Sequence, residues 1–391
     1  MNPGSTIILM PLNQPFTRLS DYYWETAKTL SKRNYKVYGY QSYQQAKNLR
    51  KIITKPTNLR LFIATSNPLI INTKPFHWLP FERFNRIYTL NRSLSFIFTL
   101  LLIKASNPEK NLILWIFHPQ FYNLISLTKK IFPQAKIVYE TPDLLTSTNK
   151  IEEKMIRLQE NYLFTHADLV TTNCPGIYNY FKKTQPQIKL TQSGFKLDVF
   201  STYNQPLSLS NKQIVIGYCG SINYRIDYDL LFKIFCNSPD WKLVLLGPIY
   251  QEKQDQTMSV EQKRQRLLNL PNVEWIPKVS SPHLPSHISS WNIGIIPYHP
   301  QLTINKYCNP TKLMEYFYME VPVITTKLVG IYSFKKNLTI ATTATEWKEA
   351  IKAILRNPPS IEQKKNNRHI AIANSWDNRV KTIENYLTQI S

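Results

Sequence analysis

A cation and a carboxylate stand close together at the start of a predicted helix, and this pair is the best candidate for chemistry in the chain. Asn309, Pro310 and Thr311 open the helix, and Lys312 and Glu315 follow. Proline is favoured in a first helical turn because its missing N–H costs nothing there. A helix N-terminus favours anions, and a nearby carboxylate can bind sugar hydroxyls. The combination suits a nucleotide diphosphate.

Two short apolar runs flank this helix and indicate buried strands. The first covers residues 293–296 and ends at Pro297 and Tyr298, and the second begins at Pro322 and covers residues 323–325. The unit is therefore strand–loop–helix–strand, which places the helix N-terminus at the carboxyl edge of a parallel sheet. Ligands of open α/β sheets bind at that edge.

Glu315 has two interpretations. It is an ordinary surface residue if the helix is amphipathic, but the helix is apolar nearly all round. Its other side chains are Leu313, Met314, Tyr316 and Phe317. A carboxylate in such surroundings needs a partner, so the sequence favours a functional role for Glu315.

Short apolar runs alternate with helical patterns along nearly the whole chain. Alternation of this kind favours parallel sheets with helices on both faces. The polar stretch 201–212 has no periodic pattern and indicates a linker between two similar halves. We therefore predict an α/β protein with two Rossmann-like, doubly wound parallel-sheet domains, residues 1–200 and 213–375, facing a central cleft. The strands predicted in the first half are residues 7–10, 36–40, 61–64, 112–117, 137–140 and 169–172.

The net charge is large and positive. The 391 residues include 48 Lys and Arg against 25 Asp and Glu, a formal charge of +23. This indicates attraction to polyanions such as nucleic acid, an anionic membrane surface or an acidic substrate. The basic residues are widely scattered, and solvated surface lysines explain most of them.

The cysteines and the N-terminus favour a cytoplasmic location. The four cysteines show no CxxC spacing, which fits a reducing compartment. Residues 1–5 carry no basic region of a signal peptide. The longest apolar run, residues 94–103, is shorter than the ~20 residues that a spanning helix needs.

One region suggests a membrane surface as partner. Arg92 and Lys104 flank the apolar run, and an aromatic and basic stretch, residues 76–88, precedes it. This pattern fits peripheral contact with the inner face of the cell membrane. The alternative is a core helix buried beneath a loop.

At residues 309–316, followed by 321–324, the chain resembles the donor-nucleotide signature of GT-B glycosyltransferases. The most similar group is the family 4-like (group 1) enzymes of cell-surface polysaccharide synthesis, including teichuronic acid-type transferases. The resemblance covers most of the chain and is most specific at this signature. Other similar segments are residues 137–143, 167–170, 194–200, 216–221, 245–248, 271–273 and 284–297.

The resemblance implies the GT-B fold and transfer of a sugar from a nucleotide-sugar donor to a saccharide or lipid-linked acceptor, with retention of configuration. Glu315 would hydrogen-bond the donor ribose. The amides of Thr311 and Lys312, with the Lys312 cation, would face the diphosphate, where leaving-group charge builds. These groups would replace a metal ion, so no metal and no cofactor are expected. Residues 376–391 would form a helix that crosses back to the first domain.

The same donor site would include Asn309, Ser221, Arg225 and Tyr298, with departures from the family pattern. A second Glu often precedes the ribose-binding one by seven intervening residues, and Tyr307 occupies that position. The usual Arg after the glycine of the first strand of the second domain is Ser221. The usual Lys further on is absent, and Arg225 is the nearest cation. The N-terminal glycine loop is also missing, with Arg18 as a weak candidate in its place.

Two residues of the first half are candidates near the acceptor. His118 lies just past the strand 112–117, at the ligand-facing edge, where it contacts the sugar or merely caps the strand end. Asp143 follows the strand 137–140, and family members often have an acidic residue in this segment. Glu140 competes with Asp143 for the role of a base within reach of the acceptor hydroxyl.

Other interpretations remain open. The same fold performs nucleotide-sugar 2-epimerisation, which needs more acid and base groups than the histidines here supply. A non-catalytic, nucleic-acid-binding protein predicts clustered basic residues with interleaved aromatics, whereas the charge here is scattered. Asp227 and Asp229 have the DxD spacing of metal-dependent transferases, but they start a helix, where Asp is favoured as a cap. A degenerate GT-B domain without activity is a further alternative.

Overall fold

The computed structural model describes most of the chain. The described residues are 3–12, 21–41, 62–65, 67–73, 85–147, 149–203, 213–250 and 258–389. Arg18, the greater part of the aromatic and basic stretch 76–88, and residues 204–212 of the predicted linker lie outside them.

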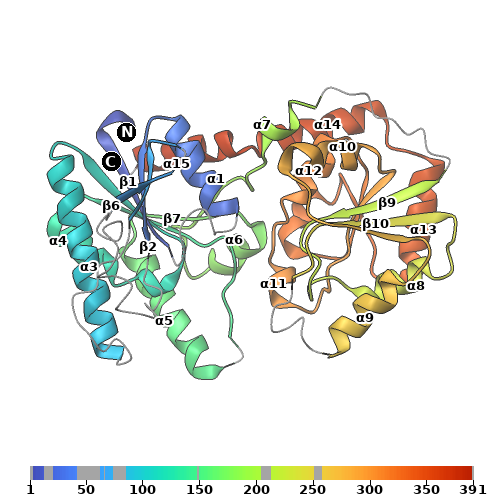
Figure 1. Cartoon of the computed structure of the whole chain (residues 1–391), viewed down its shortest axis with the longest axis horizontal. Helices are drawn as coiled ribbons and strands as arrows, with labels where there is room; N and C mark the ends of the chain where they lie inside the picture. The colour runs from blue at the N-terminus through green and yellow to red at the C-terminus, as the bar shows by residue number, and fades with distance from the viewer. Residues whose placement is uncertain are drawn as a thin grey trace, which may run out of the picture. The chain divides into compact units, whose positions relative to one another are not determined.

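The first sheet is parallel except at one edge (Figure 1). Within the described residues its strand order is β3-β4-β2-β1-β5-β6-β7-β8, and β3 runs antiparallel to β4. The central strand β1 is buried along its whole length, as a parallel strand covered on both faces must be. The strands are β1 Thr6–Leu12, β2 Lys36–Gln41, β3 Phe62–Ala64, β4 Ile70–Thr73, β5 Asn111–Ile116, β6 Lys136–Glu140, β7 Leu169–Thr172 and β8 Lys189–Leu190.

Helices cover both faces of the first sheet. On one face, Leu30 of α1 and Val380 of α15 share a core with Trp115 of β5. On the other face, the ring of Phe96 in α3 lies 4.9 Å from that of Tyr40 in β2. These helices are α1 Asp21–Lys32, α3 Asn85–Ser106, α4 Leu124–Ile131 and α5 Lys150–His166, with the 3-10 turns η1 Pro3–Ser5 and η4 Pro119–Phe121. The helices α6 Pro175–Phe181 and α7 Leu197–Phe200 follow them in the chain and belong mainly to the second of its two compact units. None of the described helices is long and apolar enough to span a bilayer.

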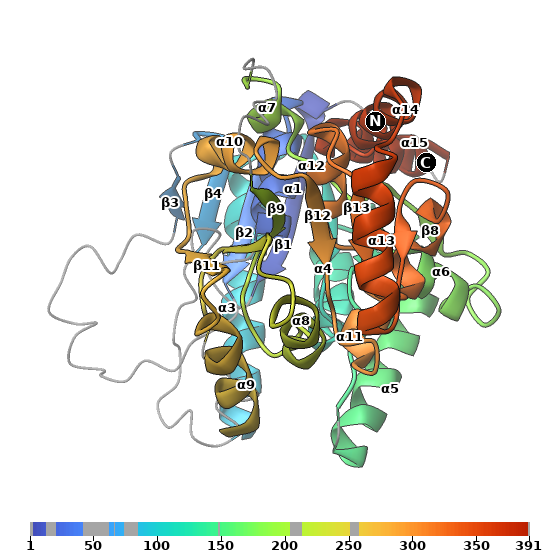
Figure 2. The ribbon, with the colours of Figure 1, turned by 90° about the vertical axis from the view of Figure 1, so that its right-hand side faces the viewer.

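The second sheet is parallel throughout its described strands, with the order β11-β10-β9-β12-β13-β14 (Figure 2). Counted from β9, this is the 3-2-1-4-5-6 order of a dinucleotide-binding fold. The strands are β9 Ile214–Cys219, β10 Trp241–Leu246, β11 Val273–Ile276, β12 Ile293–Ile296, β13 Val323–Thr325 and β14 Thr339–Ile340.

Capping boxes mark the start of two helices of the second unit. They start α13 and α14, from Thr343 to Glu346 and from Ser360 to Gln363. The helices around the second sheet are α8 Tyr228–Phe235, α9 Met258–Leu268, α10 Leu284–Ser289, α11 Thr303–Lys306, α12 Lys312–Tyr318, α13 Ala344–Arg356 and α14 Ile361–Ala373, with the 3-10 turns η5 Ser281–His283 and η6 Val329–Phe334. The last helix, α15 Trp376–Gln389, packs on the first sheet.

The chain divides into two compact units. The first comprises Met1–Thr172, Phe181–Thr191 and Val380–Ser391, and the second comprises Asn173–Tyr180 and Gln192–Arg379. The predicted boundary at residue 200 lies eight residues beyond the point where the chain enters the second unit. The reason is that Phe195 and Phe200 pack into the core of the second unit, and the amide of Phe195 donates to the Asn374 carbonyl.

Candidate functional site

The candidate site lies where the strand order of the second sheet reverses. Strands β9 and β12 are neighbours. The chain continues from β9 to β10 on one side of this pair and from β12 to β13 on its other side. Ligands of such folds bind in the crevice at the carboxyl ends of these two strands. Residues 220–226 follow β9, and residues 297–311 follow β12 and lead into α12. Every predicted donor-site residue comes from these two loops or from α12.

The turn after β9 brings the backbone close to Lys312. Gly220 has a φ of +132°, a conformation that L side chains rarely adopt. A Cβ atom added at Gly220 would lie 3.1 Å from Cε of Lys312. The hydroxyl of Tyr218 donates to the carbonyl of Ser221 at 2.9 Å. The predicted residue Ser221 therefore sits in a turn that Tyr218 fixes.

Lys312 is a buried cation held mainly by aromatic rings. It is 9% exposed, and its ammonium donates to the hydroxyl of Tyr298. The ammonium also lies 4.8 Å from the ring centroid of Tyr298 and 5.0 Å from that of Tyr218. Among the ion pairs of the described residues, none joins Lys312 to a carboxylate. A buried charge without a counter-ion is costly, so this site favours an anionic ligand.

Arg225 is a second cation beside the same ring. Its guanidinium carbon lies 4.7 Å from the ring centroid of Tyr298. Its Nε donates to Oδ1 of Asn305 at 2.7 Å, and the Asn305 amide donates back to the carbonyls of Arg225 and His299. Asn305 is fully buried and fastens the loop after β9 to the loop after β12. The sequence analysis missed Asn305, because no motif or period marks it.

Glu315 is half-buried and contacts the end of β9. The thiol of Cys219 donates to Oε2 of Glu315 at 3.2 Å. Burial, and then the negative charge of Glu315, raise the pKa of the Cys219 thiol well above its ordinary value, so the thiol stays protonated. The hydroxyl of Tyr316 accepts the Cys219 amide at 3.1 Å and donates to the Ile295 carbonyl at 3.3 Å. These bonds fix the first turns of α12 against β9 and β12.

The residues that lead into α12 are Asn309 and Thr311. Asn309 donates its side-chain amide to the carbonyl of Asn173 at 2.7 Å, within the second unit. Thr311 is exposed and precedes the helix without a side-chain cap bond. Within the described part of the chain, the backbone N–H groups of Thr311 and Lys312 donate to no recorded acceptor. Two backbone donors therefore lie at the start of α12.

The acceptor candidates lie in the first unit, after the neighbouring strands β5 and β6. His118 caps η4, where its Nδ1 accepts the amide of Gln120 at 3.3 Å. Burial, and then the positive charge of Arg92, lower the pKa of His118, so its ring is neutral at pH 7. Asp143 is exposed. The two residues follow strands that pair in parallel, so they share one edge of the sheet.

Glu140, the competitor of Asp143, is engaged in the core. It is fully buried at the end of β6. It accepts hydrogen bonds from Nε1 of Trp115, at 3.0 Å, and from the hydroxyl of Tyr22. Asp143 in contrast is an exposed residue. Burial, and then the charge of Asp143, raise the pKa of Tyr23 to about 12.

Asp227 and Asp229 have structural partners. Asp227 caps α8 by accepting the amide of Leu230 at 2.9 Å, as the capping interpretation predicted. Asp229 forms an ion pair with Lys263 at 2.6 Å.

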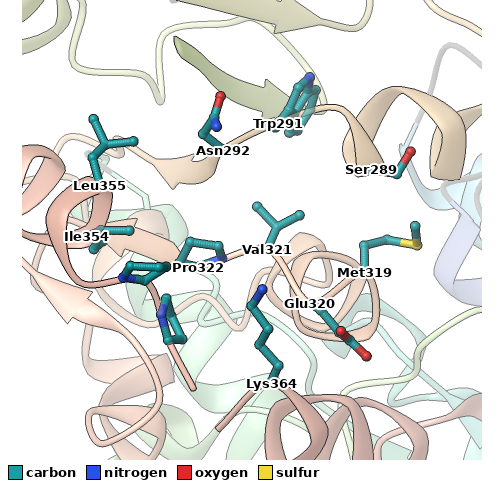
Figure 3. Close-up of a pocket in the computed structure, with 12 residues that line it drawn as sticks. Ser289, Trp291, Asn292, Met319, Glu320, Val321, Pro322, Ile354, Leu355 and Lys364 are labelled. Carbon is teal, nitrogen blue, oxygen red and sulfur yellow. The ribbon is translucent and has the colours of Figure 1, made fainter. Parts of the chain in front are cut away.

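A separate pocket lies at the opposite edge of the second sheet (Figure 3). Its volume is about 220 Å³, and Trp291, Asn292, Val321 and Pro322, which precede β12 and β13, line it. Because the predicted donor residues follow the strands instead, this pocket is distinct from the candidate site.

Comparisons with known proteins agree with this arrangement. Residues 213–357 match the family Glycosyl transferases group 1. A protein of Bacillus subtilis (strain 168) named as the teichuronic acid biosynthesis glycosyltransferase TuaH is 26% identical over 251 residues. This match covers 60% of the chain and 60% of TuaH. The resemblance to group 1 glycosyltransferases is therefore confirmed.

Solved structures share the fold of both units. Sucrose-phosphate synthase from Thermosynechococcus elongatus superposes with a TM-score of 0.71 at 14% identity, covering 99% of each chain. HepE from Anabaena in complex with UDP gives a TM-score of 0.70 at 13% identity, covering 98% of this chain and 100% of HepE. The predicted GT-B fold, with two Rossmann-like parallel-sheet units, is confirmed.

Proposed function

We propose that this chain moves a sugar from a nucleotide-sugar donor to a saccharide or lipid-linked acceptor. The match of residues 213–357 to the group 1 glycosyltransferases and the GT-B fold of both units support this proposal. The observation that carries the proposal is Lys312. It is a buried cation with no recorded carboxylate partner among the described residues, and Glu315 follows it on the same helix.

The donor diphosphate would bind between the two loops at the sheet edge. Lys312 and Arg225 both supply positive charge beside the ring of Tyr298, and the amides of Thr311 and Lys312 supply N–H donors. Negative charge builds on the leaving nucleoside diphosphate as the glycosidic bond breaks, so fixed donors at that point lower the barrier. These groups perform the task that a metal ion performs in other transferases, and we propose that the reaction is metal-independent.

Glu315 would bind the ribose. The thiol of Cys219 donates to Oε2 of Glu315, which orients the carboxylate that would accept hydrogen bonds from the ribose hydroxyls. Ser221 and Asn309 border the same region from the turn after β9 and from the start of α12. Solved HepE complexes contain UDP and UDP-glucose, which supports a nucleotide-sugar as the donor class.

Tyr307 occupies the position where the family often has a second glutamate, so the usual pair of carboxylates is absent. Its ring lies 5.3 Å from Nζ of Lys306 and 5.7 Å from the ring of Tyr180. Its carbonyl accepts the thiol of Cys174 at 2.6 Å. Tyr307 thus packs within the second unit, and Glu315 is left as the carboxylate that we assign to the donor.

The acceptor side of the proposal uses His118 and Asp143. A neutral His118 can donate or accept a hydrogen bond to a sugar hydroxyl, and an exposed Asp143 can take up the acceptor proton. The similarity to TuaH supports a role in cell-surface polysaccharide synthesis. We further propose retention of configuration and a cytoplasmic protein that works on the inner face of the membrane.

A panel of nucleotide-sugars tests the donor site. Each donor is added to wild type and to Glu315→Gln, and the thermal shift is measured. The release of nucleoside diphosphate is then measured, and the sugar products are identified. We expect one donor to stabilise wild type and to lose most of that shift in Glu315→Gln. Lys364→Met, at the opposite edge of the sheet, is the matched control. If no donor stabilises wild type more than Glu315→Gln, the site assignment is wrong, and an epimerised free donor would identify the 2-epimerase instead.

A further inference from the structure

The helix α3 turns an apolar seam outward. Ile87, Leu90, Leu94, Ile97 and Leu101 recur at spacings of three and four residues, which places them on one face. Leu90 is 48% exposed and Leu101 is 49% exposed, and the other three are half-buried. We call these five residues the α3 outer seam.

The opposite face of α3 is the one that packs on the sheet, and it is more polar than a core face usually is. Asn91, Ser95 and Thr99 are buried there beside Phe96 and Ile103. A surface helix ordinarily places its apolar residues inward and its polar residues outward. In α3 the buried face mixes these polar residues with Phe96, Leu100 and Ile103, and the outer face is apolar as well. A helix that is apolar on its outer face is suited to an apolar environment.

The segment of the chain that contains the outer seam is mostly basic, although Lys129 pairs with Asp168 at 3.6 Å. Residues 84–139 contain seven Lys and Arg and one acidic residue, Glu109. No acidic residue lies in α3 itself. The neighbouring helix α4, which packs against α3, ends with Lys129 and Lys130. An apolar helix face with surrounding cations and few anions fits the interface of an anionic bilayer.

A second copy of the chain fits this surface less well. The spacing of the seam would suit a coiled coil, but such pairs use opposite charges at the flanking positions. Two copies of α3 and α4 would bring like charges together, whereas anionic lipid neutralises them. Charge complementarity therefore favours the bilayer.

The helix α3 is connected directly to the acceptor candidates. Arg92 donates to the carbonyl of Gln120 at 2.9 Å and lies 5.1 Å from the ring centroid of Phe121. Both residues belong to η4, which His118 caps. Only α3 would thus separate a bilayer that contacts the outer seam from the loop that carries His118.

We propose that the α3 outer seam is a docking surface for an anionic lipid bilayer. It deepens the membrane location in the proposed function, but it rests on α3 and not on the transfer reaction. Docking there brings the edge of the first sheet to the membrane surface, where a lipid-linked acceptor presents its sugar.

Vesicle flotation of the full chain tests this surface. Vesicles of phosphatidylcholine with about 30% phosphatidylglycerol are compared with vesicles of phosphatidylcholine alone. We expect wild type to float with the anionic vesicles and to be released by salt. The variant Leu90→Ser/Leu101→Ser should bind at least about tenfold more weakly, because two exposed aliphatic side chains no longer enter the bilayer.

The helix α5 supplies a matched control. Ile151 and Leu158 are also exposed, but three lysines and arginines and three glutamates balance the charge of α5. Ile151→Ser/Leu158→Ser should therefore bind vesicles like wild type.

Three results would overturn the proposal. The first is equal vesicle binding by wild type and the α3 variant, and the second is an equal loss in the α5 variant. The third is a dimer that dissociates in the α3 variant while vesicle binding is unchanged, which would assign the seam to a second copy. An unchanged melting temperature confirms that the α3 variant is folded, and the donor panel reports on the proposed function separately.

Discussion

Replacing Lys312 by methionine should separate ligand binding from folding. Lys312 is 9% exposed, and of its three N–H donors one is recorded on the Tyr298 hydroxyl. The remaining donors are available to phosphate oxygens. A hydrogen bond to a charged group contributes about 1.5–3 kcal/mol, so Lys312→Met should weaken UDP binding by about 10- to 150-fold.

The free protein should respond differently. Lys312→Met loses cation–π contacts with Tyr218 and Tyr298 but also removes a buried charge that has no recorded counter-ion. These effects oppose each other, so we expect the free energy of unfolding to change by no more than about 1 kcal/mol. The melting temperature should then move by no more than about 2–4 °C.

Isothermal titration with UDP and a thermal melt without ligand measure the two quantities. Lys364→Met is the control, because Lys364 is a half-buried lysine at the opposite edge of the sheet. A dissociation constant for UDP within about threefold of wild type would refute the placement of the diphosphate. A large loss of stability without ligand would show that Lys312 is a structural residue instead.

Three further predictions concern residues around the two sites. Cys219→Ala removes the thiol that donates to Glu315, so KM for the donor should rise by roughly 2- to 12-fold with kcat unchanged. A lower kcat with an unchanged KM in initial-rate kinetics would contradict an orienting role for Cys219. Asn305→Ala breaks the bonds to Arg225 and should destabilise the second unit by about 1–3 kcal/mol in urea titrations as well as weaken UDP binding; an effect on binding alone would show that the loops hold without it. His118 has a lowered pKa in the folded state, so wild type should lose stability relative to His118→Asn as the pH falls below about 6.5. Urea denaturation of both proteins at pH 7.5 and 5.5 measures this difference, and equal stability changes would argue against a neutral His118 ring in the folded protein.

The sequence predicted the second unit well because its signals are local. The strand β12, the helix α12 and the strand β13 each follow from a few adjacent residues. The first unit was harder. The short strands β4 and β8 were missed because four and two residues give no period, and α3 begins at Asn85, nine residues before the apolar run 94–103.

The sequence predicted the charged residues of the candidate site but not the residues that hold them in place. Lys312 and Glu315 follow from a helix N-terminus at a sheet edge. The contacts of Cys219 and Asn305 join residues that are about 80 to 100 positions apart, and sequence spacing carries no signal for them. The outward seam of α3 was also missed, because an apolar run alone does not tell which face is buried.

The position of α15 at the end of the sequence determines when the first unit can finish folding during synthesis. Val380, Ile383 and Leu387 fill the core of the first unit beside Ile8 and Trp115, and Glu384 forms an ion pair with Arg33 at 2.5 Å. A ribosome releases these residues only after it has synthesised the whole second unit. The first unit to emerge is therefore the last to be completed, and until then its unfilled face offers a binding site to chaperones and proteases. Nascent chains stalled before residue 380 should be cleaved in the first unit while their second unit resists.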